Sequence, residues 1–589
     1  MRMIRKAAPG LIFVLVFADA VRAQVPSTPA GRQFLAWQKA QDSGDRTAIQ
    51  DFITKNMPFG RVEQELAIHN QSGGGYDVKR VLESTDTHLV VLAQERGGAQ
   101  QFVRITFNVG AAEPYQIAGI GIQPAQPPPD LAPPKMTEAQ AAAARSGAPF
   151  LEFSAWLEVF NSGDRARMQQ FLASNAPSLN VDGQMNFRER TGGFELRGLE
   201  QATPTSLIGL VQERNSDQFG RFVLVVEAAE PHRITRFNVN AIPRPADFPM
   251  PKMSEAELIN ALRTKLQSDA SADRFSGTVL VAKNGKTLFS EAYGLADREK
   301  KTANTLETRF RIGSMNKMFT AVSVLQLVQA GKIRLMDTVG KYIPDYPNKD
   351  VASKVTIHQL LTHTGGTGDI FGPEFDAHRS DLRTLSDYVA LYGKRAPLFE
   401  PGSRYAYSNY GMLLLGVIIE KVSGQSYYDY VADHIYKVAG MTRSGSEPEN
   451  QAVADRSVGY MRQQGTGAWV PNTDTLPYRG TSAGGGYSTV GDLMKFATAL
   501  TGHQLLDAEY TDLLITGKVD AGGGAMYAYG FEDTRKNGAG SIGHGGGAPG
   551  MNGDLRIYPQ SGWVVTVLSN LDPPAAQQAS AFIDLRLPK

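Results

Sequence analysis

The sequence predicts an α+β protein in which two small repeat domains precede one larger domain. Three observations support this prediction. The first half of the chain contains two copies of one unit, spaced by 117 to 119 residues. A proline-rich segment follows each copy, over residues 124–134 and 243–251, and such segments behave as semi-rigid spacers. The rest of the chain has strand patterns at both ends and helical patterns between them, which predicts an antiparallel sheet flanked by helices. We therefore divide the chain into residues 1–23, 24–134, 135–252 and 253–589.

Composition excludes several classes of protein. Of the 589 residues, 42% are apolar and 20% charged, which is typical of folded soluble domains and argues against a disordered, collagen-like or multi-span membrane chain. The 60 basic and 59 acidic side chains leave a net charge of +1, so no basic excess is available for a nucleic-acid partner. Because cysteine is absent, thiol nucleophiles, disulfides and cysteine-ligated metals are excluded.

The first residues have the layout of a secretory signal peptide. Basic residues precede the apolar run 11–17, and small residues stand at Val21 and Ala23, where a signal peptidase would read them. The run is too short to span a bilayer, which needs about 20 residues, and Asp19 argues against an uncleaved anchor. We expect cleavage after Ala23 and a periplasmic or secreted protein without a transmembrane anchor.

The two copies of the repeated unit match in four ordered phrases. Residues 34–37, 43–45, 89–96 and 111–114 return at 153–156, 162–164, 207–214 and 228–231. Each copy opens with a helical pattern and continues with strand patterns, such as residues 102–107 and 221–226, so each is a small α+β unit. Trp37 and Trp156 lie on apolar helical faces and are expected in the core. The partner of the repeats is unknown, and we expect a binding or positioning role.

Local signals place the elements that follow. Thr137 with Gln140, and Ser254 with Glu257, have the spacing of a capping box at a helix start. Asn284-Gly285 between two apolar runs predicts a β-hairpin. Residues 554–558 and 563–568 read as two further strands around the turn 559–562, and a last helix over about 575–585 would pack on the sheet.

One segment carries a nucleophile and a base. Ser314 follows a glycine and opens a helix whose apolar stripe ends near Gly331. Lys317 lies one turn further, on the same face of that helix. A serine hydroxyl is a weak nucleophile until a base takes its proton, and a lysine can be that base if burial lowers its pKa. The helix N-terminus favours the developing negative charge.

Three ordered motifs resemble the serine β-lactamase and penicillin-binding-protein family, class C-like. Ser314-Met-Asn-Lys317 resembles its first motif, Tyr407-Ser-Asn409 its Tyr-x-Asn motif, and His544-Gly-Gly546 its third motif in the His-x-Gly form. Residues 360–365 and 483–489 are also similar to phrases of the family. The resemblance covers the last 335 or so residues and neither repeat.

The resemblance implies a role for each of these residues. Ser314 would be the acylated nucleophile and Lys317 its proton acceptor, while Tyr407 would pass the proton to the leaving group. Which of Lys317 and Tyr407 is the base stays open. Asn409 would hold Lys317 and the substrate amide. His544 would line an edge strand beside the nucleophile, where the N–H of Gly546 or Gly547 would complete the oxyanion hole.

His544 departs from the β-lactam-destroying members of the family, which typically have a lysine there. A histidine is mostly neutral at neutral pH, and the His-x-Gly form resembles the esterase and D-aminopeptidase branches. We therefore predict an exported serine hydrolase that uses no cofactor and acts on carboxylic esters or short D-amino-acid peptides and amides. A β-lactamase or D,D-carboxypeptidase is the alternative, and an inactive sensor or binding module is the non-enzyme alternative.

Two other sequence patterns could indicate a different chemistry. Residues 480–484 match the Gly-x-Ser-x-Gly nucleophile elbow, with Ser482 as nucleophile and Asp492 or Asp533 followed by His544 as partners, but the strand–turn–helix context is missing. The histidines show no metal spacing: His358 and His363 stand five apart without accompanying carboxylates, so no metal site is predicted and His363 is expected to pack in a loop.

Overall fold

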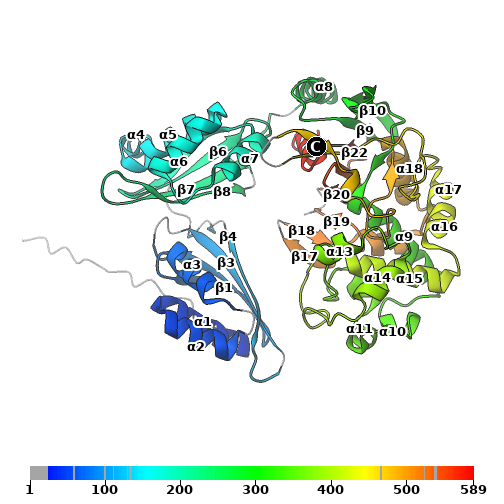
Figure 1. The fold of residues 1–589 in the computed structure, drawn as a ribbon, viewed down its shortest axis with the longest axis horizontal. Helices are drawn as coiled ribbons and strands as arrows, with labels where there is room; N and C mark the ends of the chain where they lie inside the picture. Colours follow the sequence, from blue (N-terminus) through cyan, green and yellow to red (C-terminus); the bar gives the residue numbers. More distant parts are fainter. Residues whose placement is uncertain are drawn as a thin grey trace, which may run out of the picture. The chain divides into compact units, whose positions relative to one another are not determined.

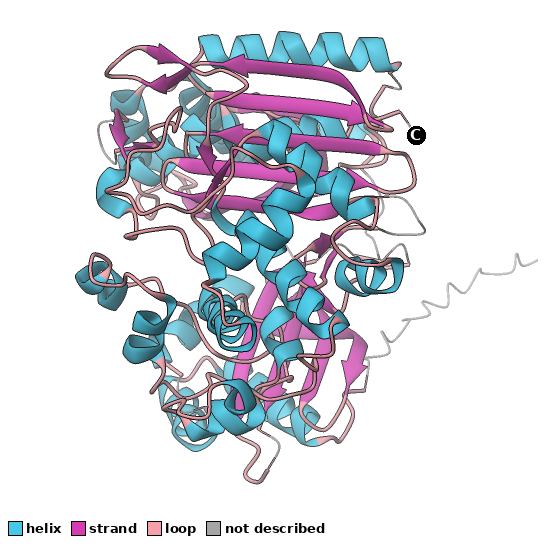
Figure 2. Cartoon of the chain, turned by 90° about the vertical axis from the view of Figure 1, so that its right-hand side faces the viewer, coloured by secondary structure: helices cyan, strands magenta, loops and turns pink. Residues whose placement is uncertain are grey.

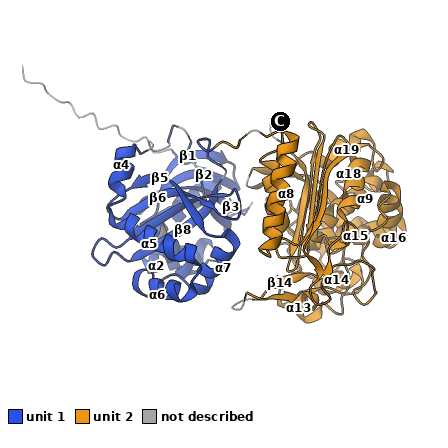
Figure 3. Ribbon diagram, turned by 90° about the horizontal axis from the view of Figure 1, so that it is seen from above, with its two compact units in different colours: residues 1–248 blue, residues 249–589 orange. Residues whose placement is uncertain are grey.

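The structure is a computed structural model. It describes residues 24–588 except 58–59, 98–100, 111, 126, 129, 132–135, 243, 252, 464–466, 523 and 536–539. The predicted signal peptide lies outside the described residues. The chain divides into two compact units, Met1–Phe248 and Pro249–Lys589 (Figure 3), called here the N-terminal and C-terminal units. Both repeats belong to the N-terminal unit, and the boundary predicted between them stays a prediction.

Each repeat consists of helices packed on a four-stranded antiparallel sheet (Figure 1). The first repeat contains α1 (Pro29–Ser43), α2 (Arg46–Asn56), α3 (Val62–Ser72), β1 (Tyr76–Ser84), β2 (His88–Glu95), β3 (Phe102–Val109) and β4 (Ile117–Pro124). The second contains α4 (Glu138–Ala144), α5 (Ala148–Ser162), α6 (Arg165–Asn175), α7 (Val181–Thr191), β5 (Phe194–Ala202), β6 (Ser206–Glu213), β7 (Phe219–Val226) and β8 (Ile234–Ile242). The sheet orders β1-β2-β3-β4 and β5-β6-β7-β8 are the same, so the predicted α+β fold of both repeats is confirmed.

The same local signals begin and end equivalent elements in the two repeats. Asp45 caps α2 through its side chain, and Asp164 caps α6 in the same way. Left-handed glycines end α1 and α5, with φ of 60° at Gly44 and 71° at Gly163, because only glycine adopts this conformation without strain. Trp37 and Trp156 are 1% and 0% exposed, as predicted for core residues.

The C-terminal unit is built on an eight-stranded antiparallel sheet of order β10-β9-β22-β21-β20-β19-β18-β17. Its strands are β9 (Gly277–Lys283), β10 (Lys286–Tyr293), β17 (Val519–Gly522), β18 (Ala525–Tyr527), β19 (Glu532–Asp533), β20 (Ile542–Ala548), β21 (Met551–Tyr558) and β22 (Trp563–Ser569). The first and last strands of the unit lie side by side, as the sequence predicted. Asn284 and Gly285 form the expected hairpin turn with φ of 48° and 77°.

Helices cover both faces of this sheet (Figures 2 and 3). On one face, Val279 and Val567 pack against leucines of α8 (Glu255–Ser271) and alanines of α20 (Ala575–Asp584). On the other, Leu280 packs in the large cluster that contains α9 (Asn316–Gln329) and α15 (Asn409–Ser423). The alternation of strand side chains therefore divides the core into two layers. The capping boxes at Thr137 and Ser254 are both present.

The remaining short elements connect these layers. They are β11 (Leu295–Asp297), β12 (Thr302–Ala303), β13 (Phe310–Arg311), η1 (Gly313–Met315), α10 (Val339–Tyr342), α11 (Lys349–Lys354), α12 (Ile357–Leu361), α13 (Pro373–His378), α14 (Leu385–Tyr392), α16 (Tyr427–Val431), η2 (Ala432–Tyr436), α17 (Lys437–Ala439), β14 (Tyr460–Arg462), β15 (Trp469–Pro471), η3 (Thr473–Thr475), β16 (Tyr487–Ser488), α18 (Val490–Thr501) and α19 (Ala508–Ile515). Within the described part of the chain, no helix is long and apolar enough to cross a membrane.

Candidate active site

The serine and lysine of the first motif lie at the start of α9. Ser314 is in the three-residue 3-10 helix η1, and Gly313 before it has φ of 51°, a conformation that favours glycine. Nearly every residue of the first three turns of α9 is buried, so hydrophobic packing fixes the orientation of this helix. The Nζ of Lys317 consequently lies 3.0 Å from the Oγ of Ser314. The predicted one-turn spacing is observed.

Lys317 is a fully buried amine with three hydrogen-bond partners. Its Nζ donates to Ser314 Oγ, to Asn409 Oδ1 at 2.7 Å and to the Ala483 carbonyl at 2.6 Å. Burial lowers the pKa of Lys317 to about 7, and the charge of Asp369 acts in the opposite direction. A large fraction of this lysine is therefore neutral at neutral pH and can accept a proton.

Tyr407 lies beside Lys317. The Nζ of Lys317 lies 4.7 Å from the centre of the Tyr407 ring, in a cation–π geometry. The residue is 37% exposed, so part of the ring reaches the surface. Burial raises the pKa of Tyr407 above its usual range, while a hydrogen bond with Ser314 acts in the opposite direction. Tyr407 therefore stays a protonated phenol at neutral pH.

Asn409 is oriented from both ends of its amide. It begins α15, whose N-cap Ser408 accepts the Gly411 N–H at 2.9 Å. Its Nδ2 donates to the two carboxylate oxygens of Asp369, at 2.9 and 3.1 Å. Because the amide nitrogen faces Asp369, the amide oxygen must face Lys317.

Glycines bring the strand β20 against the nucleophile. A Cβ on Gly546 would lie 2.0 Å from the Ile312 carbonyl oxygen, and a Cβ on Gly313 would lie 2.9 Å from the Gly547 nitrogen. Side chains would therefore separate the two backbones. Gly546 and Gly547 lie beside the serine turn as expected. However, β20 is interior to the sheet and not an edge strand. Because β19 pairs only as far as Gly543, residues 545–548 have no paired strand on that side among the strands that the structure describes.

His544 is buried, at 3% exposed, and both of its ring nitrogens are engaged. Nδ1 bonds the Gly545 carbonyl, which can only accept, so Nδ1 carries the proton. Nε2 then accepts from the Tyr527 hydroxyl at 3.1 Å. Burial lowers the pKa of His544, assisted by the charge of Lys317 and opposed by Glu532. His544 is therefore a neutral, internally bonded side chain.

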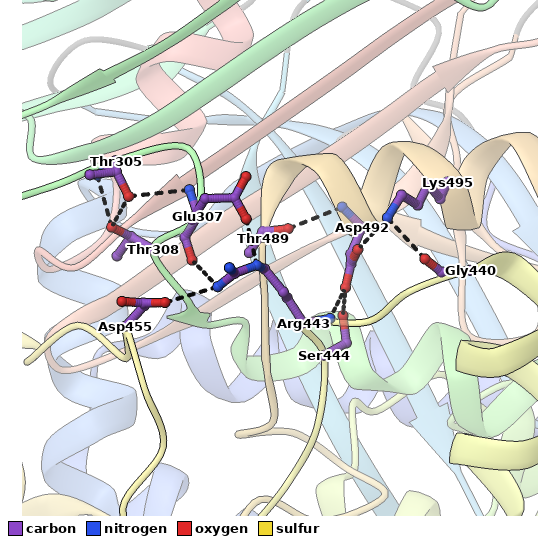
Figure 4. A network of polar contacts seen from close by, with 10 residues as sticks. All are labelled: Thr305, Glu307, Thr308, Gly440, Arg443, Ser444, Asp455, Thr489, Asp492 and Lys495. Atoms are coloured by element: carbon purple, nitrogen blue, oxygen red, sulfur yellow. Dashed lines mark hydrogen bonds and ion pairs between the residues drawn. The ribbon is translucent and has the colours of Figure 1, made fainter.

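The competing elbow motif does not form a triad. Ser482 is 0% exposed, and its hydroxyl donates to the Met412 carbonyl at 2.9 Å. Asp492 accepts from the Arg443 N–H at 2.7 Å, from Ser444 at 2.9 Å and from Lys495 at 3.1 Å (Figure 4). Asp533 pairs with Arg535 at 2.8 Å. The motif instead supplies the Ala483 carbonyl that Lys317 bonds.

Sequence reasoning missed two participants, Asp369 and the Ala483 carbonyl. Asp369 lies in a loop without a recognisable motif, and its only signal is its place just after the phrase 360–365. The Ala483 carbonyl carries no side-chain signal at all. His363, expected to pack in a loop, is buried with its ring 4.5 Å from that of Tyr407 and its Nδ1 accepting the Ser408 N–H at 3.2 Å. It supports the Tyr407–Asn409 segment.

The described residues contain no group of three or more histidine, aspartate or glutamate side chains that could hold a metal ion. A second Tyr-x-Asn sequence, at residues 346–348, has a different role. Tyr346 is buried with its hydroxyl 2.9 Å from that of Tyr410, and Asn348 caps α11.

Comparison with known proteins places the C-terminal unit in a family. The family model described as Beta-lactamase matches residues 260–587. The "Putative penicillin-binding protein PbpX" of Bacillus subtilis (strain 168) is 31% identical over 296 residues, which are 50% of this chain and 70% of that protein. Protein flp of Staphylococcus aureus (strain MW2) is 32% identical over 207 residues, 34% of this chain and 41% of that protein.

Solved structures show the same fold. The penicillin-binding protein of Bacillus halodurans is 33% identical, with a TM-score of 0.51 over 55% of this chain and 99% of that one. The octameric penicillin-binding protein homologue of Pyrococcus abyssi is 28% identical, with a TM-score of 0.50 over 56% and 78% of the two chains. The fold and the matched residues define the class of β-lactamase/transpeptidase-like domains. The chain belongs to the beta-lactamase family.

Proposed function

We propose that the protein is an exported serine hydrolase that forms an acyl-enzyme on Ser314. Its substrates would be carboxylic esters or short D-amino-acid peptides and amides, and the chemistry needs no metal or organic cofactor. The observation that carries the proposal is the 3.0 Å contact between Lys317 Nζ and Ser314 Oγ, made by a buried amine whose pKa is about 7. Export rests on the layout of residues 1–23.

In the acylation step, neutral Lys317 accepts the proton of Ser314 while Oγ bonds to the substrate carbonyl carbon. The carbonyl oxygen becomes an oxyanion, which the N–H groups of Ser314 and of Gly546 or Gly547 would stabilise. The proton then passes from Lys317 to the leaving oxygen or nitrogen. The phenol of Tyr407 can relay it, because it stays protonated beside Lys317. The bond to the leaving group breaks and the acyl group remains on Ser314.

Deacylation repeats these transfers with water. The water loses a proton to Lys317, directly or through Tyr407, as its oxygen attacks the ester carbon. The bond to Ser314 Oγ breaks and Oγ regains a proton. Of the two candidate bases, Lys317 fits better because its pKa is lowered to about 7, whereas that of Tyr407 is raised.

Neutral substrates fit the third motif better than β-lactams. His544 is neutral, and its ring nitrogens bond Gly545 and Tyr527, so it is not poised to hold a carboxylate. This favours esters and amides over the carboxylate-bearing substrates of a β-lactamase or D,D-carboxypeptidase. The latter activity is the second candidate, because relatives of the chain are named penicillin-binding proteins. An inactive binding module is disfavoured by the intact contacts among Ser314, Lys317 and Asn409.

The test is hydrolysis of a chromogenic short-chain ester by wild type, Ser314→Ala and Ser482→Ala. We expect Ser314→Ala to lose at least about 10³-fold in kcat/KM and Ser482→Ala to retain activity. A fluorophosphonate probe should add its mass to a peptide containing Ser314. Activity that survives in Ser314→Ala, or is lost only in Ser482→Ala, would overturn the proposal. A panel of D-amino-acid amides, β-lactams and D-Ala-D-Ala peptides would then separate the substrate classes.

A further inference from the structure

The N-terminal unit contains a cavity that no part of the hydrolase chemistry uses. Its volume is about 460 Å³, within the range of small-molecule sites. Most of its lining comes from the first repeat, with apolar walls from Met57, Ile120 and Ile122 and polar groups from α3, β1 and β2. Arg236, Asn238 and Asn240 of β8, in the second repeat, also line it.

The carboxyl group of Glu65 is the least expected of these polar groups. Glu65 is 5% exposed and lines the cavity. One oxygen, Oε2, accepts from Trp37 Nε1 at 3.0 Å and from the Gln41 amide. The other oxygen, Oε1, has no hydrogen-bond donor among the residues that the structure describes. Burial raises the pKa of Glu65, and the hydrogen bonds from Trp37 and Gln41 act in the opposite direction, so burial is only partly offset in this site.

The other charges of the cavity are matched. Glu95, 5% exposed, accepts two parallel bonds from the Arg236 guanidinium, at 2.9 and 3.0 Å. Glu65, Glu95 and Arg236 are the charged side chains among the described lining residues. Because the charges of Glu95 and Arg236 neutralise each other, Glu65 is the one carboxyl group among these three side chains without a paired cation.

In the second repeat, a neutral amide stands where the first repeat has the carboxyl group of Glu65. Gln184 replaces Glu65 and still accepts from Trp156 Nε1, at 2.9 Å. A neutral amide therefore satisfies the tryptophan, and the carboxyl group of Glu65 is not needed for that bond. Four positions that hold Gln41, Ile68, Tyr76 and Ile120 in the first repeat hold Phe160, Phe187, Phe194 and Phe237 in the second.

Those four phenylalanines pack on one another and on Trp156. Ring centres are 4.5 Å apart for Trp156 and Phe160, 5.5 Å for Phe160 and Phe194, 5.4 Å for Phe187 and Phe194, and 4.3 Å for Trp156 and Phe237. In the first repeat, Ile68, Tyr76 and Ile120 border the cavity instead. The two copies of one fold thus differ by a filled aromatic core in one and an open, acid-lined cavity in the other.

We propose that the cavity of the first repeat binds a small organic amine. The ammonium group would donate to Glu65 Oε1 and pair with its charge, and an apolar body would lie against Met57, Ile120 and Ile122. A charge-assisted hydrogen bond in a desolvated site is stronger than a neutral one, which favours an amine over an alcohol of the same shape. The site is independent of the hydrolase centre at Ser314.

Calorimetric titration of the mature full-length protein tests this with phenethylamine, 2-phenylethanol and 3-phenylpropanoate. We expect the amine to bind most tightly in the Ser314→Ala background, which removes turnover. Glu65→Gln copies the second repeat and keeps the tryptophan bond, so it should fold normally and weaken amine binding at least about tenfold. Glu63→Gln, on the same helix but exposed, is the matched control and should bind like the parent.

Location is tested separately. Crystals soaked with 4-bromophenethylamine should give a bromine anomalous peak beside Ile120 and Ile122. An equal affinity for the alcohol or the acid, unchanged binding in Glu65→Gln, or a bromine peak only elsewhere would each overturn the proposal. Ile68→Phe with Ile120→Phe, both taken from the second repeat, should also weaken binding while circular dichroism and thermal unfolding show a folded chain.

Discussion

Asp369 accepts two hydrogen bonds from the side-chain amide of Asn409, and this determines which atom Asn409 offers to Lys317. The bonds are 2.9 and 3.1 Å long, and on the other side Asn409 Oδ1 accepts from Lys317 Nζ at 2.7 Å. The three residues form one chain from an exposed carboxylate to a buried amine. Asp369 therefore acts on Lys317 both through this chain and through its charge.

The first prediction concerns Asp369→Asn. The carboxylate raises the pKa of Lys317, so its removal should lower that pKa and move the acidic limb of the kcat/KM profile to lower pH. Loss of the amide orientation should also reduce kcat. The measurement is a pH profile of ester hydrolysis. Asp376→Asn removes a neighbouring surface charge without touching Asn409 and should leave the limb in place; an unmoved limb in Asp369→Asn would contradict this role.

The wild-type pH profile is the second prediction. Lys317 accepts a proton only in its neutral form, and its pKa is about 7. kcat/KM for a neutral ester should therefore rise with pH through about 7 and then level off. The raised pKa of Tyr407 keeps the phenol protonated across this range, so no decline should occur near neutrality. A profile that is flat between pH 5.5 and 8.5 would exclude Lys317 as the base.

Stability should depend on pH through the same lysine. The pKa of Lys317 is about 7 in the folded protein and 10.5 for an unperturbed lysine. Between these values the unfolded chain binds more protons, so this group makes the free energy of unfolding rise with pH across that window. Lys317→Met removes this titrating group and with it this pH dependence. The free energy of unfolding of Lys317→Met minus that of wild type should therefore be highest near pH 6. It should decrease toward pH 10 by up to about 4 kcal/mol, because only the wild type gains stability across this range. Urea denaturation at three pH values measures it, and a constant difference would refute it.

Two adjacent glycines of β20 should respond differently to alanine. A Cβ on Gly546 would meet the Ile312 carbonyl oxygen at 2.0 Å, whereas one on Gly545 would meet the side-chain nitrogen of Gln577 at 3.3 Å. Gly546→Ala should separate β20 from the serine turn, lowering both the melting temperature and kcat. Gly545→Ala serves as the matched control and should change either quantity little. Equal losses in the two variants would mean that the close approach of β20 is not required.

The main features of the C-terminal unit were predictable because they depend on local chemistry. The hairpin at Asn284-Gly285, the capping box at Ser254 and the serine–lysine spacing each follow from a few neighbouring residues. The short strands β17 to β19, which place β20 inside the sheet, carry little pattern because they have only two to four residues each.

The rest of the site depends on contacts between distant segments. Asp369 reaches Asn409 across 40 residues and Lys317 reaches Ala483 across 166, and no single-sequence periodicity encodes either distance. The cavity of the first repeat was equally hidden. Glu65 looks ordinary in sequence, and only alignment of the two copies on their observed elements shows the four phenylalanines that replace Gln41, Ile68, Tyr76 and Ile120.

The position of β9 beside β22 has a consequence for biosynthesis. Val279 pairs with Val567, which follows it by 288 residues. While a ribosome makes the intervening chain, the hairpin of β9 and β10 has one edge of unsatisfied backbone groups and two apolar faces awaiting cover. Such an edge can pair with other nascent chains. The C-terminal unit should therefore acquire its core only after translation is nearly complete, and a chaperone that shields residues 277–293 until then should increase the yield of active enzyme.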